Sequence, residues 1–420
     1  MSLGLGLSAL QSQRAALELF AQDTAPATLT TLRIQDSLAG LDASVANELL
    51  LPPGEQLEAR QEADDRQKKL ANYWIQIAHN LSYGNRELRP ITTLQLGLGD
   101  YLMAIERARV WHGQGRAAEA FQAYQDSTQL LDQRLFPAVR ALGQVKAEQQ
   151  ARAEHQQQAQ MEASRFGLVL GGLGLLGYLV AVQWFLSQRT RRTLNPALVG
   201  AMVLTLGLGS DVLRSLDTSA AQLTQSKTET FGALVDLRTI RTLAYSAHAD
   251  VNRALLDPTR TLEYDTSFQL KLNQIVRYSV TPQLPGKALK PPSRSGGLLM
   301  AVADTLQQPE EAALVAKAAN ALYTYRQQYE HINRLDQQGQ TAAAIALTTG
   351  YQTNQLNGSF ELFRDAHHKL IEIELAVFDQ RLGAASQTLD RLRWQLPLAS
   401  VVILGLTVFG IQCRLREYRL

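Results

Sequence analysis

The stretch with the most potential for chemistry is "RDAHHKLIEIE", residues 364–374. His368 and Glu372 are four residues apart, so they share one face of a helix and could bind a metal ion together. The alternative places His367 on the apolar stripe of that helix with a hydrogen-bond partner. His368, Lys369 and Glu372 then form a solvated face. We favour this second interpretation, in which the stretch is structural.

Motifs for catalysis or cofactor binding are absent from the rest of the sequence. A di-iron bundle needs Glu-x-x-His on two helices, whereas this chain has only the related pair Asp365 and His368. The glycines of "GGLG" (171–174) lie inside an apolar stretch, where glycine serves helix packing and not phosphate binding. Cys413 is the single cysteine, which excludes an intramolecular disulfide and a cysteine-based zinc site. We therefore predict that the protein is not an enzyme and carries no metal and no cofactor.

Charge and hydropathy point to a membrane instead. The chain has 41 Lys and Arg against 39 Asp and Glu, and this balance excludes nucleic acid as a partner. Three long windows are free of charge: residues 166–186, 194–210 and 396–413. The first would reach about 31 Å as a helix, which is the thickness of a hydrocarbon core. We expect each window to be a transmembrane helix and not a buried core helix, so the lipid bilayer is the first expected partner.

Arginines near these windows predict their orientation. The bend between the first two windows carries Arg189, Arg191 and Arg192, and the tail "RLREYRL" carries three more. Two windows separate the bend from the tail, so both lie on one side of the membrane. Short loops rich in Lys and Arg stay in the cytoplasm. We therefore predict a multi-pass protein of the plasma (inner) membrane, with a cytoplasmic C terminus and with residues 11–165 and 214–395 outside the cytoplasm.

The two large segments are copies of one unit. Residues 29–58 align without a gap to residues 234–263, with 11 identities in 30 positions. A second pair, "GQGRAAEAF" (113–121) and "QQGQTAAAI" (337–345), follows at an offset that is 19 residues larger. We assign the extra residues to the Pro-, Gly- and Ser-rich stretch 281–297, which has the composition of an exposed loop. A repeat of this length indicates a duplicated domain.

Each copy is expected to fold as four helices. In the first copy, the first helix ends at "LLLPPG" (49–54), and the next two span about 55–83 and about 92–112. The fourth begins after the turn at 113–115 and shows apolar residues at helical spacing. No strong stop signal precedes the membrane, so this helix runs directly into the span. The predicted fold is all-α, with two up-down four-helix bundles joined by transmembrane helices.

Two polar positions recur in both copies. Arg33 corresponds to Arg238, and Asn47 corresponds to Asn252. Buried polar side chains fix the register of packed helices, and the same residues could line a binding pocket. A structural role is the commoner of the two, and these four residues are our candidates for contact with a ligand or partner.

The resulting organisation has eight parts. They are a partial transmembrane helix (1–10), a four-helix bundle (11–165), a transmembrane helix (166–186), a cytoplasmic loop (187–193), a transmembrane helix (194–213), a second bundle (214–395), a transmembrane helix (396–413) and a tail (414–420). Leu3 and Gly4 match Leu208 and Gly209 at the offset of the repeat, so Met1 falls inside the expected first span. We therefore expect the native chain to begin upstream of Met1 with further apolar residues.

This layout resembles the extracytoplasmic four-helix-bundle sensor domains of bacterial chemoreceptors and sensor kinases. The stretches "LAGLDASVANELL" (38–50) and "LAYSAHADVNRALL" (243–256) resemble the first helix of duplicated bacterial membrane proteins. The resemblance implies a relay from a periplasmic binding protein or a small ligand to a cytoplasmic serine/threonine kinase. Only seven residues follow Cys413, so we expect any output to come from another protein. The alternative is a structural or scaffolding protein of the cell envelope that forms homo-oligomers.

Overall fold

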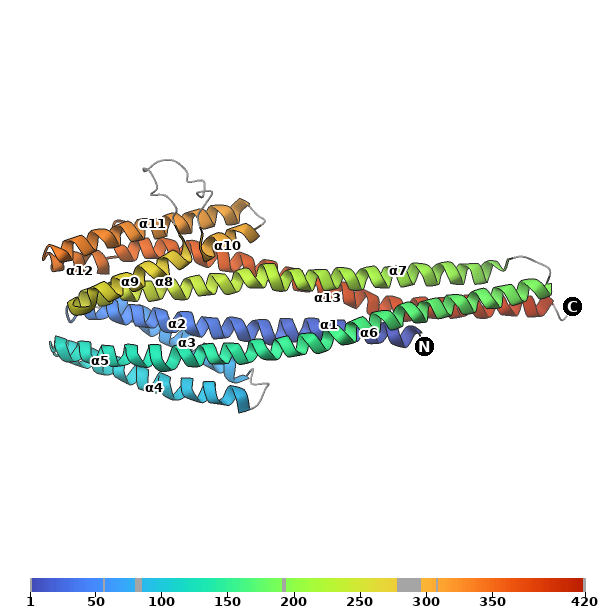
Figure 1. The fold of residues 1–420 in the computed structure, drawn as a ribbon, viewed down its shortest axis with the longest axis horizontal. Helices are drawn as coiled ribbons and strands as arrows, with labels where there is room; N and C mark the ends of the chain where they lie inside the picture. Colours follow the sequence, from blue (N-terminus) through green and yellow to red (C-terminus); the bar gives the residue numbers. More distant parts are fainter. Residues whose placement is uncertain are drawn as a thin grey trace. The chain divides into compact units, whose positions relative to one another are not determined.

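Regular structure in the described residues is helical. The computed structural model describes residues 2–55, 57–79, 85–190, 194–277, 296–306 and 309–417. Figure 1 shows helices throughout, and the β-type pairing found in these residues is an isolated bridge between Arg277 and Gly296. The prediction of an all-α fold is confirmed.

The chain divides into two compact units, and both copies contribute to each. The unit that we call the bundle unit comprises Ala25–Ala147 and Glu229–Val377. The unit that we call the span unit comprises Met1–Thr24, Glu148–Thr228 and Phe378–Leu420. Each copy thus gives one continuous stretch to the bundle unit, where the two copies meet.

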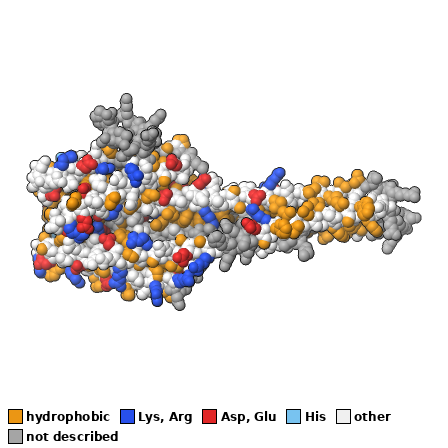
Figure 2. Space-filling view, viewed as in Figure 1, with side chains coloured by type: hydrophobic (Ala, Val, Ile, Leu, Met, Phe, Trp, Pro, Cys, Tyr) orange, Lys and Arg blue, Asp and Glu red, His pale blue; other side chains and the backbone are white. Residues whose placement is uncertain are grey.

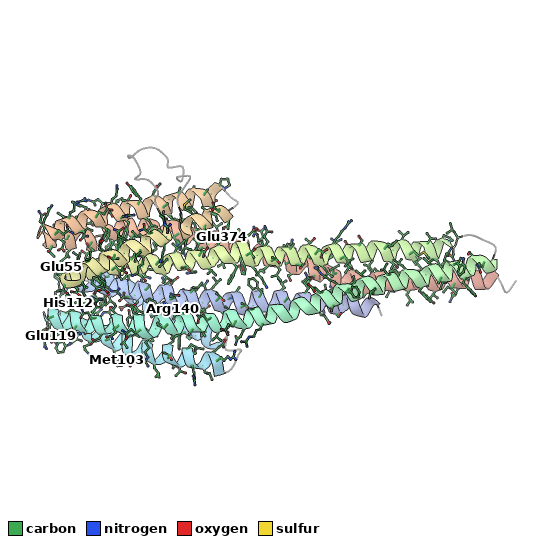
Figure 3. All side chains as sticks on the ribbon, in the orientation of Figure 1. Glu55, Met103, His112, Glu119, Arg140 and Glu374 are labelled. Atoms are coloured by element: carbon green, nitrogen blue, oxygen red, sulfur yellow. The ribbon has the colours of Figure 1, made fainter. Side chains whose placement is uncertain are left out.

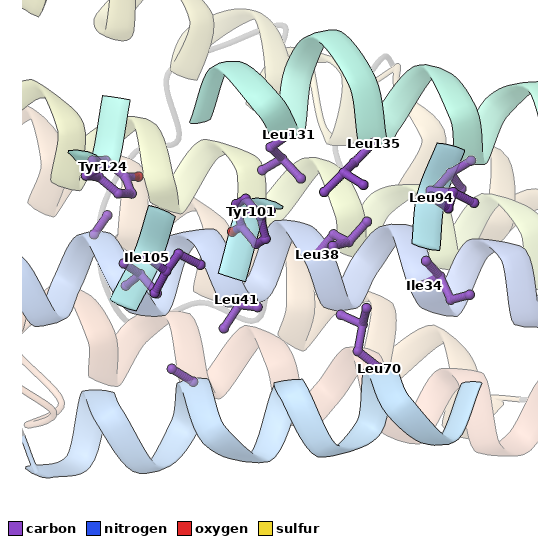
Figure 4. Packing of buried hydrophobic residues seen from close by; sticks show 14 of the residues in the cluster. Ile34, Leu38, Leu41, Leu70, Leu94, Tyr101, Ile105, Tyr124, Leu131 and Leu135 are labelled. Atoms are coloured by element: carbon purple, nitrogen blue, oxygen red, sulfur yellow. The ribbon is translucent and has the colours of Figure 1, made fainter. Parts of the chain in front are cut away.

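In the bundle unit, the first copy forms four helical rods. They are α2 (Ala25–Leu50), α3 (Leu57–His79), α4 (Asn85–Gly113), and a fourth rod made of α5 (Ala117–Leu130), the π-helical turn η2 (Leu131–Leu135) and the start of α6 (Phe136–Thr190). Figure 4 shows Tyr101 from α4 packed near Leu131 and Leu135 from η2, with Leu38 from α2 beside them. These side chains are nearly inaccessible to solvent, because the apolar residues of each rod recur at helical spacing and face one common core.

The second copy follows the same plan with a more aromatic core. Its elements are α8 (Gly232–Leu256), the 3₁₀ turn η4 (Pro258–Arg260), α9 (Thr261–Ile275), α10 (Leu298–Thr305), α11 (Pro309–Gln337), α12 (Thr341–Thr349) and the start of α13 (Leu356–Glu417). The rings of Phe268 and Tyr329 lie 4.0 Å apart, and those of Tyr325 and Phe360 lie 5.6 Å apart. Large aromatic side chains therefore fill the core of the second copy. In the first copy, aliphatic side chains fill the corresponding core together with Tyr101 and Tyr124.

The first helices of the two copies pack against each other. In α2, every residue of the stretch 36–50 is buried, which one bundle alone would not achieve. The added cover comes from α8, whose residues 247–254 are buried in the same way. The helices α2 and α8 are thus the shared centre of the bundle unit (Figure 1).

Two helix boundaries differ from the prediction. The third helix of the first copy begins at Asn85 and not near residue 92, with Pro90 inside it. Pro90 is the sixth residue of this helix, so its missing N–H removes one intrahelical hydrogen bond within the first two turns. The fourth helix of the second copy is broken between α12 and α13. There the side chain of Gln355 accepts from the backbone N–H of Gln352 at 2.9 Å, and Asn357 donates to the carbonyl of Thr349 at 2.9 Å.

Among the described residues, three helical stretches that enter the span unit are long and apolar enough to cross a membrane. The corresponding stretches are Glu162–Gln188, Pro196–Leu256 and Leu356–Cys413. They contain the predicted windows 166–186 and 396–413, and all of the window 194–210 except its first two residues. Figure 2 shows hydrophobic side chains gathered on the surface of this part of the chain, as expected for helices that face lipid. Length and composition therefore agree with a membrane protein.

The helix α7 (Pro196–Gln225) begins with a well-formed cap. The side chain of Asn195 accepts from the N–H of Ala197 at 3.1 Å, and Pro196 occupies the first turn. This arrangement satisfies a free N–H group at the point where proline costs nothing. The side-chain amide of Asn195 also donates to the carbonyl of Gly410 at 2.8 Å, so the cap joins α7 to α13 inside the span unit.

The predicted cytoplasmic loop is partly helical. The helix α6 continues to Thr190, so residues 187–190 extend the span and do not form a loop. The side chain of Arg189 lies outside the described residues, as do Arg191 and Arg192. Most of the predicted exposed loop at 281–297 also lies outside them.

Both first helices contain a π-helical turn at related positions. These turns are η1 (Leu19–Thr24), which follows α1 (Ser2–Glu18), and η3 (Ser226–Phe231), which follows α7. Each lies where the chain passes from the span unit to the bundle unit. A π-helical turn inside a long helix often marks a functional site, and hydropathy and periodicity did not predict it.

Candidate functional site

The interface between α2 and α8 is held by buried ion pairs. Three carboxylates lie on α2 at equal intervals, and each pairs with an arginine from another helix. The pairs are Asp36 with Arg238 at 3.0 Å, Asp42 with Arg253, and Glu48 with Arg109 at 2.8 Å. The first two arginines belong to α8, so they join the two copies. The cost of desolvating both charges offsets much of the attraction in such a buried pair, and we expect these pairs to act mainly by fixing the register of the interface.

The central pair belongs to a larger buried cluster. Arg253 donates to Asp42 from one terminal nitrogen and to Asp250 from the other at 3.2 Å. Its Nε donates to the hydroxyl of Tyr124 at 3.1 Å, and that hydroxyl donates to Asp42 at 3.0 Å. Lys271 from α9 donates to Asp250 at 2.5 Å. Five side chains from four elements of both copies therefore form one hydrogen-bonded network.

Burial sets the electrostatics of this cluster. It raises the pKa of Asp42, which Arg253 opposes, while the negative charge of Asp132 adds to the increase. Burial also raises the pKa of the Tyr124 hydroxyl. Burial is the largest influence on Arg253 and would lower its pKa, but Asp42, Tyr124 and Asp250 together outweigh it and the pKa is raised. The arginine is thus permanently charged, and its two carboxylate partners provide the countercharge.

A cavity of about 460 Å³ opens onto this cluster. Its walls come from α2, from the fourth rod of the first copy, and from α8 and α9 of the second copy. The lining includes the cluster residues together with Asp126, Asp132, Phe136, Arg260 and Glu263. A volume of this size is in the range of small-molecule sites. Because both copies line the cavity, its shape depends on how the copies pack.

A related set of contacts between the copies, which we call the second groove, lies where α3 of the first copy meets α8 and α13 of the second. At the repeat offset, Lys271 corresponds to Arg66 and Ser267 corresponds to Glu62. In this second groove, Arg66 lies over the ring of Tyr245 at 4.1 Å and pairs with Glu62 at 2.7 Å. Arg364 from α13 also pairs with Glu62 at 2.8 Å. This groove therefore contains an additional arginine of the protein itself.

The second groove also contains a buried histidine. His248 stacks on Phe360 with ring centroids 4.5 Å apart, and its Nδ1 lies 2.9 Å from the hydroxyl of Tyr325. Burial lowers the pKa of His248 to about 4, with Glu62 opposing the shift. The imidazole is neutral at neutral pH, which suits a packed position between aromatic rings.

The four predicted site residues lie at or beside the α2–α8 interface, but none lines the cavity. Asn252 donates to the carbonyl of Ala43 across the interface at 3.3 Å, and Asn47 is buried on α2. Arg238 pairs with Asp36, and Arg33 lies over the ring of Tyr73 at 5.9 Å. The geometry of Asn252 and Arg238 agrees with a role in helix register, and ligand contact by any of the four stays a prediction.

The sequence analysis did not predict the cavity cluster, because its candidate residues were those shared by both copies and the cluster residues are not shared. Asp42 corresponds to Ala247, Arg253 corresponds to Glu48, and Lys271 corresponds to Arg66. The cluster could have been found by looking for charged residues on the first helix that differ between the copies. Such residues can pair across the interface between two related helices.

The histidine-rich stretch agrees with the structural interpretation. His367 is buried, and its Nε2 lies 2.9 Å from the carbonyl of Leu237. Burial lowers the pKa of His367 to about 3. His368 and Glu372 lie 3.3 Å apart on an exposed face. The first histidine therefore joins α13 to α8, and the second is solvated.

Comparison with known proteins adds one positive finding. The profile of the family described as actinobacterial sensor domain matches residues 16–158, which is most of the first copy. Searches of curated proteins and of solved structures found no match. The first copy is thus similar to a bacterial sensor domain, and its helix α6 continues into an apolar stretch long enough to span a membrane.

Proposed function

We propose that the protein is a multi-pass sensor or signal relay whose bundle unit lies outside the cytoplasm and whose output is carried by another protein. The observation that carries this proposal is helix continuity. The helix α6 runs from Phe136 to Thr190 and α13 from Leu356 to Glu417, each from the bundle unit into an apolar span. The match to a sensor domain supports it.

The proposed mechanism is a shift between two packing states of the α2–α8 interface. A ligand or a periplasmic binding protein that favours one state would change the positions of the helices that leave the bundle unit. Their cytoplasmic ends would present this change to a partner such as a kinase. The protein itself would need no catalytic group, no metal and no cofactor.

The relay is tested by perturbing the bundle unit and measuring the span ends. Spin labels are placed on cysteines at Gln188 and Gln412 in a Cys413→Ser background, with the full chain in lipid nanodiscs. The added variant Asp42→Asn weakens the α2–α8 interface, and Asp65→Asn on exposed α3 is the matched control. We expect the label distance distribution to change with Asp42→Asn alone. An unchanged distribution would contradict the relay.

A scaffold protein is the second candidate, and one observation favours it. Leu96, Met103 and Val110 form an exposed apolar row on α4, and Figure 3 shows Met103 at its outer side. At the larger repeat offset of 224 residues, the second copy has Asn320, Gln327 and Arg334 at these positions. A scaffold that associates through this row predicts a stable homo-oligomer in mild detergent, which Met103→Gln with Leu96→Gln would dissociate. Light scattering of the two forms decides between these outcomes.

A further inference from the structure

The cavity between the two copies has the features of a binding site. Its floor is the buried cluster around Arg253, and its side wall is the fourth rod of the first copy, including η2. The wall supplies Gln125, Gln129 and Gln133, whose amides can donate and accept hydrogen bonds. Aromatic rings of Phe121, Phe136 and Tyr264 complete the lining.

The positive groups of the lining are already neutralised. Arg253 is shared between Asp42 and Asp250, and Lys271 is paired with Asp250. Arg260 donates to both oxygens of Glu263 at 2.8 and 2.6 Å. An anionic ligand would therefore have to displace a carboxylate of the protein from each cation, which is costly.

The negative groups of the lining are not all neutralised. Asp126 accepts a hydrogen bond from Gln122 at 3.3 Å, and neither Asp126 nor Asp132 forms an ion pair within the described parts of the chain. The lining has the carboxylates of five residues and the basic groups of three. The carboxylates are Asp42, Asp126, Asp132, Asp250 and Glu263, and the basic residues are Arg253, Arg260 and Lys271. The cavity thus carries an excess of negative charge beside aromatic rings.

The second groove shows what fills the related space. At the break before α13 the offset between the copies grows by four residues, from 224 to 228, because the buried residues Phe363 and Leu370 then match the buried residues Leu135 and Leu142. With this offset Arg364 corresponds to Phe136. Arg364 donates to Glu62 at 2.8 Å and to Glu361 at 2.8 Å. One groove therefore contains a guanidinium of the protein between two carboxylates, and the other has a cavity next to Phe136.

We propose that this cavity binds a small organic cation with a guanidinium or primary amine group, which occupies the position that Arg364 fills in the second groove. Asp132 and Asp126 bind the charged head, the ring of Phe136 packs against it, and the glutamine amides bind its polar groups. Such a ligand bridges the fourth rod of the first copy and the α8–α9 pair of the second. Its effect on signalling rests on the proposed sensor function, whereas its binding does not.

The binding test uses the purified full-length protein in detergent, with agmatine as the probe and glutarate as the anionic control. Isothermal titration calorimetry is expected to show saturable binding of agmatine and none of glutarate. Asp132→Asn is expected to weaken agmatine binding by about tenfold or more, because it removes a charge-assisted hydrogen bond. Glu119→Gln removes an equal charge from the exposed start of the same rod, outside the cavity (Figure 3), and is expected to leave binding unchanged.

A second variant supplies the missing cation. Phe136→Arg places a guanidinium where Arg364 lies in the other groove, so it is expected to abolish agmatine binding while the thermal midpoint stays at or above that of the native protein. Absence of saturable agmatine binding up to about 10 mM, or equal weakening by Asp132→Asn and Glu119→Gln, would overturn the proposal. Binding of glutarate in place of agmatine would also overturn it. Any of these results leaves the spin-label test of the relay unaffected.

Discussion

Single residues on the first helices decide how the copies pair. Asp42 and Arg253 come from corresponding helices, yet neither has an identical counterpart in the other copy. Because these positions differ between the copies, the contact between the two helices joins opposite charges, and the cavity lies beside it.

Arg253→Ala should strongly destabilise the bundle unit. It leaves Asp42 buried without its cation, and breaking a buried pair in this way costs about 3–5 kcal/mol. Unfolding of the detergent-solubilised protein, followed by tryptophan fluorescence in denaturant, measures the loss. Lys68→Ala removes an exposed pair with Asp65 and should change stability by less than about 1 kcal/mol. Equal effects of the two substitutions would contradict the assigned role of Arg253.

The buried histidines predict a loss of stability in acid. The folded-state pKa values of His248 and His367 are lowered from 6.5 to about 4 and about 3 by burial. Between these values and 6.5 the unfolded chain binds more protons, so their contribution to stability is complete above pH 6.5 and is lost as the pH falls toward 4. Thermal midpoints measured across this range should fall with pH.

Substitution identifies the groups responsible for this pH dependence. His248→Gln should reduce the slope of the thermal midpoint against pH, whatever its effect on the midpoint itself. His368→Gln replaces an exposed histidine and should leave the slope unchanged. An equal slope in all three proteins would assign the acid sensitivity to other groups.

At the scale of elements, a single break distinguishes the fourth rods of the two copies. In the first copy α5 continues through η2 into α6, and η2 lines the cavity. In the second copy the chain leaves the helix after α12 and restarts at α13. After this break, Arg364 of α13 pairs with Glu62 at 2.8 Å, so side chains of the protein occupy the second groove.

Gly358→Ala should disturb the restart of α13. A Cβ at Gly358 would lie 2.1 Å from the carbonyl oxygen of Gln352, so the backbone of the break must move. Such overpacking costs about 1–3 kcal/mol. Gly383→Ala is the matched control in the same helix, because a Cβ there meets nothing within 4 Å. It should be neutral or stabilising by up to about 1 kcal/mol, and the same denaturant titration compares both variants.

At the scale of the whole molecule, the proposed topology places the two units in different surroundings. The bundle unit has an aqueous, charged surface, and the three candidate spans expose large apolar side chains such as Trp184, Leu173 and Phe409. The predicted orientation adds that the end of α13 faces the cytoplasm. Both statements concern solvent access and can be tested with one thiol reagent.

Cys413 is the single thiol and is exposed at the end of α13. A membrane-impermeant maleimide should not label Cys413 in intact cells and should label it only after lysis. A cysteine at Gln114, in the exposed turn after α4, should label from outside in a Cys413→Ser background. Labelling of Cys413 but not of position 114 in intact cells would reverse the orientation.

The helical class, the long apolar windows and the similarity between the two halves of the chain can be predicted without a structure. These features depend on local periodicity, on the length of apolar windows and on matches between aligned residues, all of which can be read along the chain. The structural role of His367 was predicted for the same reason, since it lies on the apolar stripe of its own helix.

The contact between the two copies and the cavity beside it could not be predicted from the sequence. Arg253 and Asp42 are separated by 211 positions in the chain, and their pairing depends on the packing of α8 on α2. The choice of Arg33, Asn47, Arg238 and Asn252 followed identity between the copies, and identity selects residues that serve each helix in the same way. The cavity arises where the copies differ, so its residues emerged only when opposite charges were placed face to face.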